Sequence, residues 1–487
     1  MTARRVIWFR RDLRVTDNPA LASVLAEPGA VVPVFIFDRP LLASKVFGDG
    51  CVAFMLDSLR DLADALGRAG MPLQWRVGDP REEIPRLARD LKAEAVWWNR
   101  DYEPGAVARD QHVSRALAEQ RICVRTCKDH LVFEPDQLRN VSGQPFQRYS
   151  AFRTAWWKQW HAEAVRSPGG GLPLVAARAA APAPFPLPSA QDLGYDTVIP
   201  WMRGGEQAGA ARLRAFVGGA LHRYVTGRNR PGSDETSILS PHFRFGTLNP
   251  RTAIRAALER LHGGGAVSRP DVYTWIDELI WREFFHHVMA GFPHVADGPF
   301  RPSASVAPAR RPDDLARTLF RAWCEGRTGY PLVDAGMRQL NQTGWMHNRV
   351  RMVVASFLVK DLRLDWRWGE RYFMGRLVDA DLAVNNGNWQ WCASTGTDAM
   401  PGYRIFNPTL QGKKFDPDGA YVRRYVPELA KVPTAAIHAP WDMSRDLQER
   451  AGCRIGADYP RPIVDHERAR REYLELAGAE RGRAHDN

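Results

Sequence analysis

The sequence has few cysteines, few lysines and no long apolar run, and each shortage excludes a class of protein. Its six cysteines are scattered through 487 residues without the histidine and cysteine spacing of a zinc site, so we expect reduced thiols in a cytoplasmic protein. The longest apolar runs, such as residues 352–359, are far shorter than the about 20 residues that cross a membrane. The N-terminal residues contain no apolar stretch with a cleavage site, so we expect neither a secretory signal nor a membrane partner.

The net charge of the chain is positive, and arginine carries almost all of it. Of the 67 basic residues only eight are lysines, at positions 45, 92, 128, 158, 360, 413, 414 and 431, and the net charge is +12. A basic surface concentrates polyanions, and the guanidinium group forms paired hydrogen bonds with phosphate. A general bias of composition toward arginine explains the same numbers equally well. The charge is therefore compatible with DNA as a partner but does not establish it.

The first 130 residues alternate between short apolar runs and helical patterns. The runs at 6–9, 31–37, 94–98 and 122–125 are typical of strands, and residues 53–70 have apolar positions three and four apart. This alternation predicts a Rossmann-like α/β domain with a parallel sheet over residues 1–130. No G-x-G-x-x-G loop follows the first strand, so the ordinary dinucleotide-binding fingerprint is absent.

The rest of the chain is expected to be helical after a linker. Residues 167–171 are rich in Pro and Gly, and residues 176–190 in Ala and Pro, which favours an interdomain linker over 131–203. Helical patterns then follow one another without a convincing strand, at 208–224, 249–261, 272–290, 313–325, 330–342, 348–363 and 368–374. We therefore predict an all-helical domain over 204–475 and a short charged tail over 476–487.

One predicted helix carries an unusual mixture of side chains on a single face. Within residues 275–285, the positions that share a face are Glu278, Trp281, Arg282 and Phe285. A buried carboxylate is costly unless it is paired or hydrogen-bonded, so this face is either a half-exposed ion pair or a binding surface. The segment alone leaves both interpretations open.

Two later segments show the same mixture. Residues 345–352 predict a second helical face, whose aligned positions are Asn348, Arg351, Met352 and Ala355. Residues 379–391 contain spaced aspartates, asparagines, a glycine and two tryptophans, which is typical of a loop that holds a polar heterocycle. A tryptophan is usually a core or interface residue, so any one segment could be structural. Three such segments close together favour a binding site.

Six blocks of sequence, in order along the chain, resemble the photolyase/cryptochrome family, and most closely its class I cyclobutane pyrimidine dimer photolyases. The blocks are Trp8–Leu21, Trp275–Phe285, Thr328–Asp334, Trp345–Met352, Asn385–Asp398 and Arg404–Pro408. The resemblance extends from residue 6 to about residue 470. It implies an α/β antenna domain followed by a helical domain that binds FAD.

The resemblance also assigns cofactor contacts. It implies FAD-binding roles for Tyr224, Thr236, Ser237, Ile238, Leu239, Ser240, Trp275, Arg282, Asp379, Asp381 and Asn385. Hydroxyl and backbone N–H groups of the 236–240 segment can bind a pyrophosphate without a glycine-rich loop. Asn385 would face the flavin N5 atom. Signalling relatives carry Asp or Cys there, so the asparagine favours repair.

The activity implied is light-dependent repair of cyclobutane pyrimidine dimers by electron transfer from excited, reduced FAD. The alternative is a cryptochrome-type blue-light photoreceptor. The implied catalytic residues are Glu278, Asn385, Trp389 and Trp366, and the implied DNA-binding residues are Glu278, Trp281, Asn348, Arg349, Arg351, Met352, Trp391 and Arg404. Relatives that repair the pyrimidine–pyrimidone photoproduct carry histidines where this chain has Asn348 and Met352, which favours cyclobutane dimers. We expect a monomer that binds dimer-containing DNA.

Two features depart from the family pattern. Relatives relay electrons through three tryptophans; Trp389 and Trp366 match the first two, but Asp313 stands near the third position. This predicts slower or rerouted photoreduction, through Trp323, Trp368 or Tyr372. Residues 102–106 read YEPGA where folate-binding relatives have YExNE. A deazaflavin, a folate, a second flavin or no antenna chromophore all remain open.

Overall fold

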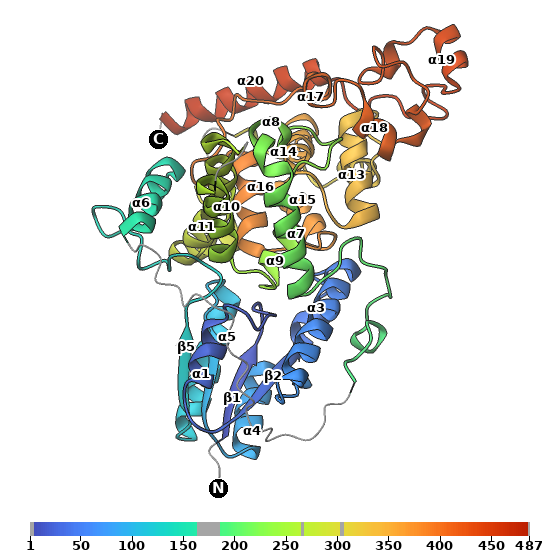
Figure 1. The fold of residues 1–487 in the computed structure, drawn as a ribbon. Helices are drawn as coiled ribbons and strands as arrows, with labels where there is room; N and C mark the ends of the chain where they lie inside the picture. Colours follow the sequence, from blue (N-terminus) through green and yellow to red (C-terminus); the bar gives the residue numbers. More distant parts are fainter. Residues whose placement is uncertain (1–3, 163–185, 264–266, 302–305, 486–487) are drawn as a thin grey trace. The chain divides into compact units, whose positions relative to one another are not determined.

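The structure, a computed structural model, describes residues 4–162, 186–263, 267–301 and 306–485 (Figure 1). These residues form two compact units. The sheet unit comprises Met1–His222, Ser237–Ala296 and Val378–Ala383, and the helical unit comprises Arg223–Thr236, Asp297–Leu377 and Val384–Asn487. Several helices of the predicted helical domain therefore belong to the unit that contains the sheet. The domain boundaries at 130, 203 and 475 stay a proposal.

The sheet unit is built on five parallel strands in the order β3-β2-β1-β4-β5. The strands are β1 (Arg4–Phe9), β2 (Ala30–Asp38), β3 (Gln74–Gly78), β4 (Ala93–Asn99) and β5 (Cys123–Cys127). The four predicted strands are confirmed. Strand β3 was not predicted, because its residues QWRVG form no apolar run.

One face of the sheet is covered by helices α4 (Pro80–Asp90) and α5 (Pro104–Glu119). Alternate strand residues point into this core, which contains Val6, Trp8, Val32, Val34, Ile36, Ile84, Leu87, Val96, Trp98, Val113 and Leu117. Helix α1 (Pro19–Leu25) contacts β1, β4 and β5, while α2 (Arg39–Ala43) contacts β2 and β3. The strand order reverses between β1 and β4, the place where open α/β sheets bind ligands outside the strand ends. The loops after β1 and β4 are therefore positioned for function.

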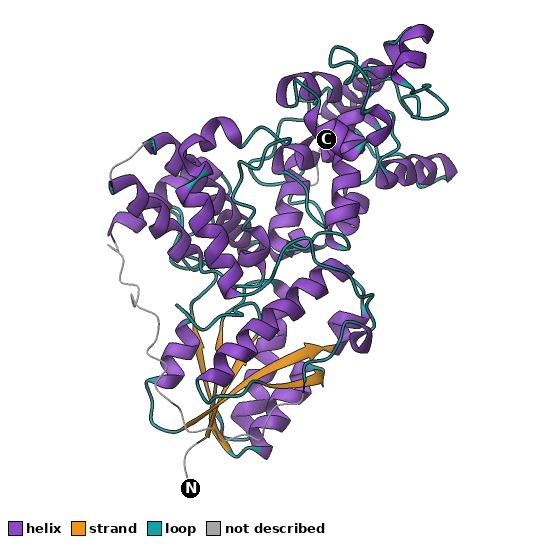
Figure 2. Ribbon diagram, turned by 45° about the vertical axis from the view of Figure 1, so that its right-hand side comes forward, coloured by secondary structure: helices purple, strands orange, loops and turns teal. Residues whose placement is uncertain are grey.

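The sheet unit also contains helices from both halves of the sequence (Figure 1). Figure 2 draws the helices in purple and the strands of the sheet in orange. They are α3 (Asp49–Arg68), α6 (Tyr149–Ala162), α7 (Glu206–Gly218), α9 (Ser240–Arg244), α10 (Pro250–His262) and α11 (Arg269–Gly291). Helix α11 packs against α6 and α10. Ser268 caps it, since its side chain accepts a hydrogen bond from the backbone N–H of Asp271.

The prediction of a linker over the whole of 131–203 is wrong for its first part. Helix α6 forms there, and the buried carboxylate of Glu283 on α11 accepts a 2.9 Å hydrogen bond from Trp156 Nε1. The same carboxylate accepts hydrogen bonds from the backbone N–H groups of Val132 and Phe133 at 2.5 and 3.0 Å. A chain so anchored cannot act as a spacer. Residues 163–185, which include most of the Ala/Pro-rich stretch, lie outside the described residues.

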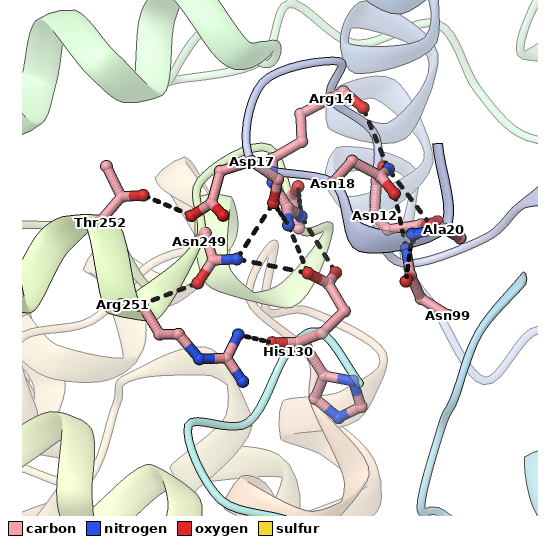
Figure 3. A network of polar contacts seen from close by, with 12 residues as sticks. Asp12, Arg14, Asp17, Asn18, Ala20, Asn99, His130, Asn249, Arg251 and Thr252 are labelled. Carbon is pink, nitrogen blue, oxygen red and sulfur yellow. Dashed lines mark hydrogen bonds and ion pairs between the residues drawn. The ribbon is translucent and has the colours of Figure 1, made fainter. Parts of the chain in front are cut away.

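A buried polar network anchors the loop that follows β1 (Figure 3). Arg14 forms an ion pair with Asp129 and donates a 2.9 Å hydrogen bond to the Gly246 carbonyl. Asn249, the cap of α10, donates to Asp129 at 3.3 Å, and Thr252 donates to Asp17 at 2.7 Å. Buried charges require such partners. The network explains why the first signature block is rich in Arg, Asp and Asn.

The helical unit consists of helices, most of them short. They are α8 (Tyr224–Gly227), α12 (Asp314–Glu325), α13 (Pro331–Thr343), α14 (Asn348–Ser356), α15 (Trp366–Met374), α17 (Pro408–Phe415), α18 (Ala420–Tyr425), α19 (Arg445–Ala451), α20 (His466–His485) and most of α16 (Leu382–Ala393). Most predicted helices after residue 204 are confirmed within a few residues. Two differ: the helix predicted over 208–224 ends at Gly218, and the helix predicted over 348–363 ends at Ser356. A π-helical turn, Phe357–Asp361, follows the second. The predicted charged tail instead belongs to α20 as far as His485.

The expected loop over 379–391 is also wrong, because helix α16 begins at Leu382 and only residues 379–381 precede it. Asparagine and glycine lowered the helical signal of this segment, but tertiary contacts of its side chains outweigh propensity. Asn386 donates a 2.9 Å hydrogen bond to the carboxylate of Glu370, and the buried Trp389 packs against Phe373.

Candidate functional site

The segment assigned to the cofactor's phosphates has a strained backbone. Ile238 has a φ of 50°, a left-handed value that is unfavourable for a β-branched residue. Arg212 Nε donates a 2.8 Å hydrogen bond to the Ser237 carbonyl and so supports this turn. Hydroxyl side chains at Thr236, Ser237 and Ser240 accompany it. Strain of this kind occurs at ligand clamps, and the donor chemistry fits a pyrophosphate.

Helix α11 presents Trp275 and Arg282, two further residues assigned to the cofactor. Trp275 is buried and its ring centroid lies 5.1 Å from that of Phe216 on α7. Arg282 donates hydrogen bonds to the carbonyls of His130 at 2.9 Å and Phe243 at 3.4 Å. Burial lowers the pKa of this guanidinium. The two carbonyls fix its direction without neutralising its charge.

Asp381, which lies on the segment just before α16, is an ionised carboxylate. Arg11 forms an ion pair with it, and His286 Nε2 lies 3.4 Å from it. Burial by itself would raise the pKa of Asp381, but His286 and Arg11 hold it well below the usual range. Asp379 is also buried. Both aspartates belong to the sheet unit, as do Ser237–Ser240, Trp275 and Arg282, whereas Tyr224, Thr236 and Asn385 belong to the helical unit.

The amide of Asn385 has a defined orientation within the helical unit. Its Nδ2 atom donates a 3.0 Å hydrogen bond to the Glu370 carbonyl. This bond fixes the orientation of the amide through its nitrogen. Burial raises the pKa of the Glu370 carboxyl, which accepts the hydrogen bond from neighbouring Asn386. Tyr224, on α8, is buried and contacts the guanidinium of Arg228.

Trp281, one of the residues assigned to DNA, has one ring face fixed by a neighbour. Tyr149 of α6 stacks on it with ring centroids 3.5 Å apart and an interplanar angle of 8°. The Tyr149 hydroxyl donates a 3.0 Å hydrogen bond to the Asp277 carbonyl, which orients the tyrosine. Trp281 stays partly exposed, as does Glu278 one helical turn before it. The indole therefore forms a rigid platform beside a carboxylate.

The sequence interpretation missed Tyr149, which lies in the span predicted as a linker. A signal was present, because residues 149–160 contain five aromatic side chains, namely Tyr149, Phe152, Trp156, Trp157 and Trp160. Such a density is typical of a packed helix rather than a spacer.

The other assigned DNA contacts lie in the helical unit. Arg349 donates a 2.7 Å hydrogen bond to Asn229 and lies 4.6 Å from the Phe415 ring centroid. Its Nη1 atom is 3.8 Å from the Met352 sulfur. Cys392 Sγ of α16 lies 4.0 Å from the Met352 carbonyl, so α14 and α16 meet at this point. Trp391, next to Cys392, is partly exposed.

Arg351 and Arg404, the other two arginines assigned to DNA, differ in their hydrogen bonds. Arg351 Nε donates a 2.7 Å hydrogen bond to the Met346 carbonyl, while Asn348 is exposed at the start of α14. Arg404 is exposed, and its carbonyl accepts a 2.8 Å hydrogen bond from the buried Lys360. Burial lowers the pKa of Lys360 to about 8.

The assigned electron relay contacts Trp323, one of the alternative routes named from the sequence. Trp389 and Trp323 are both buried, and their ring centroids are 6.2 Å apart. Trp323 also contacts Tyr372 at 5.8 Å. Trp366 is buried, but in the described part of the chain it makes no ring contact with Trp389. The observed aromatic array thus connects Trp389 to Trp323.

The described residues contain neither a metal-binding cluster nor a membrane-spanning helix. No group of histidine, cysteine and acidic side chains there could hold a metal ion. Among the same residues, every helix is too short or too polar to cross a membrane.

Comparison with known proteins places this arrangement in a family. The model for DNA photolyase matches residues 5–169, and the model for the FAD binding domain of DNA photolyase matches residues 275–479. A curated "Deoxyribodipyrimidine photo-lyase" from Synechococcus is 41% identical over 98% of this chain and 96% of its own. A class III photolyase from Agrobacterium tumefaciens has a TM-score of 0.89 at 37% identity, covering 99% of this chain and 98% of its own. A Synechocystis cryptochrome has a TM-score of 0.85 at 29% identity, covering 98% of this chain and 99% of its own. The chain belongs to the DNA photolyase family.

Proposed function

We propose that this chain repairs cyclobutane pyrimidine dimers in DNA, using light absorbed by bound, reduced FAD. The full-length similarity to named photo-lyases favours repair over a signalling photoreceptor. The observation that carries the proposal is the Trp281 platform, held by Tyr149 beside Glu278. A rigid, half-exposed indole next to a carboxylate suits a flat base with a carbonyl edge. The class within the family stays a prediction, because the Agrobacterium relative is a class III enzyme.

The residues of this chain bind and orient, and the cofactor supplies the electron. Enzymes that act on a base extrude it from the stack, photolyases among them. Trp281 and Trp391 would stack on the extruded dimer, and Met352 would pack against it. Glu278 would hydrogen-bond a pyrimidine carbonyl and stabilise the charge that develops there. Arg349, Arg351, Arg404 and Asn348 would contact the DNA backbone.

The FAD contacts are proposed by the same correspondence. Ser237–Ser240, with Thr236 and Tyr224, would hold the phosphates and ribose, and Trp275 and Arg282 would lie beside the cofactor. Asn385 would offer its oriented amide to the flavin, with Asp379 and Asp381 near the ring and its sugar chain. Trp389 and Trp366 would pass electrons to an oxidised flavin. An antenna chromophore, whether deazaflavin, folate or flavin, remains an open part of the proposal.

The test is light-dependent repair of an oligonucleotide that carries one cyclobutane dimer. The purified holoenzyme is reduced, mixed with the oligonucleotide, and illuminated or kept in the dark. We expect repair only in light, and little on the pyrimidine–pyrimidone photoproduct. Glu278→Ala should lower the yield by about tenfold or more, since a hydrogen bond to a charged group is worth about 1.5–3 kcal/mol.

A matched control is Glu259→Ala, which removes an exposed carboxylate from α10. It should repair like the parent protein. Parent-level repair by Glu278→Ala, or a parent protein without light-dependent repair, contradicts the proposal. We further propose a cytoplasmic monomer, which light scattering and cell fractionation test.

A further inference from the structure

Arg11, in the loop after β1, reaches a segment some 370 positions later in the sequence. Its guanidinium pairs with the carboxylate of Asp381, which precedes α16. The same group donates a 2.7 Å hydrogen bond to Glu103 and lies 3.6 Å from Asp101, both in the loop after β4. Arg11 therefore joins the two loops at the switch point of the sheet to the 378–383 segment. All of these residues belong to the sheet unit.

A second arginine holds the backbone of the same segment. Arg244 Nε donates a hydrogen bond to the Ala380 carbonyl. The carbonyl of Arg244 in turn accepts a 3.3 Å hydrogen bond from Arg11 Nε. Arg244 thus holds the backbone of Ala380, and Arg11 holds the side chain of Asp381. Arg11 also contacts Arg244, so it is connected to both anchors of the segment.

The cluster is balanced in charge and largely buried. Its cations are Arg11, Arg244 and Arg282, and its anions are Asp101, Glu103 and Asp381. His286 and His130 complete it, with ring centroids 5.2 Å apart. Burial lowers the pKa of Arg244, whereas the surrounding carboxylates raise the pKa of Arg11 despite its burial. Removing Arg11 would leave Asp381 with His286 as its main cationic neighbour and would leave Asp101 without its strongest one, a destabilising change for the local geometry of buried carboxylates.

We propose that Arg11 is a positioning residue for FAD, which acts by holding the 379–381 segment in the conformation that binds the cofactor. This inference rests on the proposed cofactor roles of Asp379 and Asp381. It means that the loop after β1 takes part in flavin binding by supporting the 379–381 segment. Arg11 itself acts only through Asp381 and through the support of Arg244.

The experiment measures release of FAD from the purified, full-length holoenzyme after dilution, followed by the rise of flavin fluorescence. Arg11→Gln should release FAD at least tenfold faster than the parent protein. Arg11→Lys keeps one charge and should fall between the two. Arg100→Gln is the matched control, because it breaks the ion pair with Glu134 in the same unit without touching the 378–383 segment. It should release FAD like the parent.

A double-mutant cycle separates positioning from a general loss of stability. Asp381→Asn should accelerate release by itself, and adding it to Arg11→Gln should accelerate release little further, because both changes break one interaction. Independent, multiplying effects, or unchanged release in Arg11→Gln, overturn the inference. If Asp381→Asn alone has no effect, the proposed role of Asp381 fails and the inference fails with it. Where Arg11→Gln does not fold, the cycle is run with Arg11→Lys. Unchanged release in Arg11→Lys, or an effect that multiplies independently with that of Asp381→Asn, then overturns the inference.

Discussion

The stack of Tyr149 on Trp281 predicts that a residue outside the signature blocks controls recognition of damaged DNA. The two rings are nearly parallel at 3.5 Å, and Tyr149 is itself held through its hydroxyl bond to the Asp277 carbonyl. Replacing Tyr149 by Leu keeps an apolar side chain but removes the stacked ring. Trp281 can then adopt other orientations, so some of the binding free energy must be used to order it.

The size of the effect follows from the stack. Aromatic pairs contribute about 0.5–1.5 kcal/mol beyond the burial of their area. If this amount is lost on binding, the Kd for dimer-containing DNA rises about two- to twelvefold. The Kd for undamaged DNA should not change, because backbone contacts dominate it. Fluorescence anisotropy with matched damaged and undamaged oligonucleotides measures both constants.

Two variants make this prediction specific. Tyr149→Phe keeps the ring and loses only the hydroxyl bond, so it should retain most of the discrimination. Tyr273→Leu removes a comparable stack on α11, against Trp157 at 4.7 Å and 24°, and should leave discrimination intact. Unchanged discrimination in Tyr149→Leu, or an equal loss in Tyr273→Leu, would refute the reasoning. Thermal unfolding of each variant confirms that the binding temperature lies below its transition.

Three further predictions follow from the same structure. Trp323→Phe or Trp368→Phe should slow photoreduction of oxidised flavin while leaving repair by pre-reduced enzyme intact; transient absorption tests this, and unchanged rates in both would remove these two routes. Burial lowers the pKa of His287 to about 3, so the folded state excludes a proton that the unfolded state binds, and stability should fall as the pH drops below about 6.5. Between pH 7 and 5 the free energy of unfolding should fall by about 2 kcal/mol because of His287. In His287→Gln, the free energy of unfolding measured in urea should lose this part of its pH dependence; an unaltered pH dependence would contradict the prediction. DNA binding should weaken steeply with salt, and Arg404→Gln should reduce the logarithmic salt slope by about one; an identical slope would exclude a phosphate contact.

The strands and most helices were predictable because their side chains repeat the period of the element. The core strands β1, β2 and β4 are apolar on both faces, so their runs stand out in the sequence. Strand β3 lacked that signal because a glutamine and an arginine interrupt its residues QWRVG. Helix α6 was missed although its five aromatic side chains are a local signal of a packed helix; only the partner of Trp156, Glu283, lies far away in sequence.

The candidate site was predictable in its residue types and less so in its supports. Glu278 and Trp281 were placed on one helical face by spacing alone, and the structure agrees. Neither Tyr149 behind Trp281 nor Arg11 behind Asp381 could be inferred, since 132 and 370 positions separate the members of each pair. Contacts over such distances depend on how elements pack, which no local pattern records.

By itself the sequence determined the parallel α/β architecture, the helical remainder and the family, because periodicity and ordered motifs are local properties of the chain. Tertiary structure alone decided which side chains support the functional ones. Tyr149, from the span predicted as a linker, fixes one face of the Trp281 indole, and Arg11, from the loop after the first strand, anchors Asp381, 370 positions later. The physical reason is that burying a charge or fixing a ring requires a partner in space, and only folding brings that partner near.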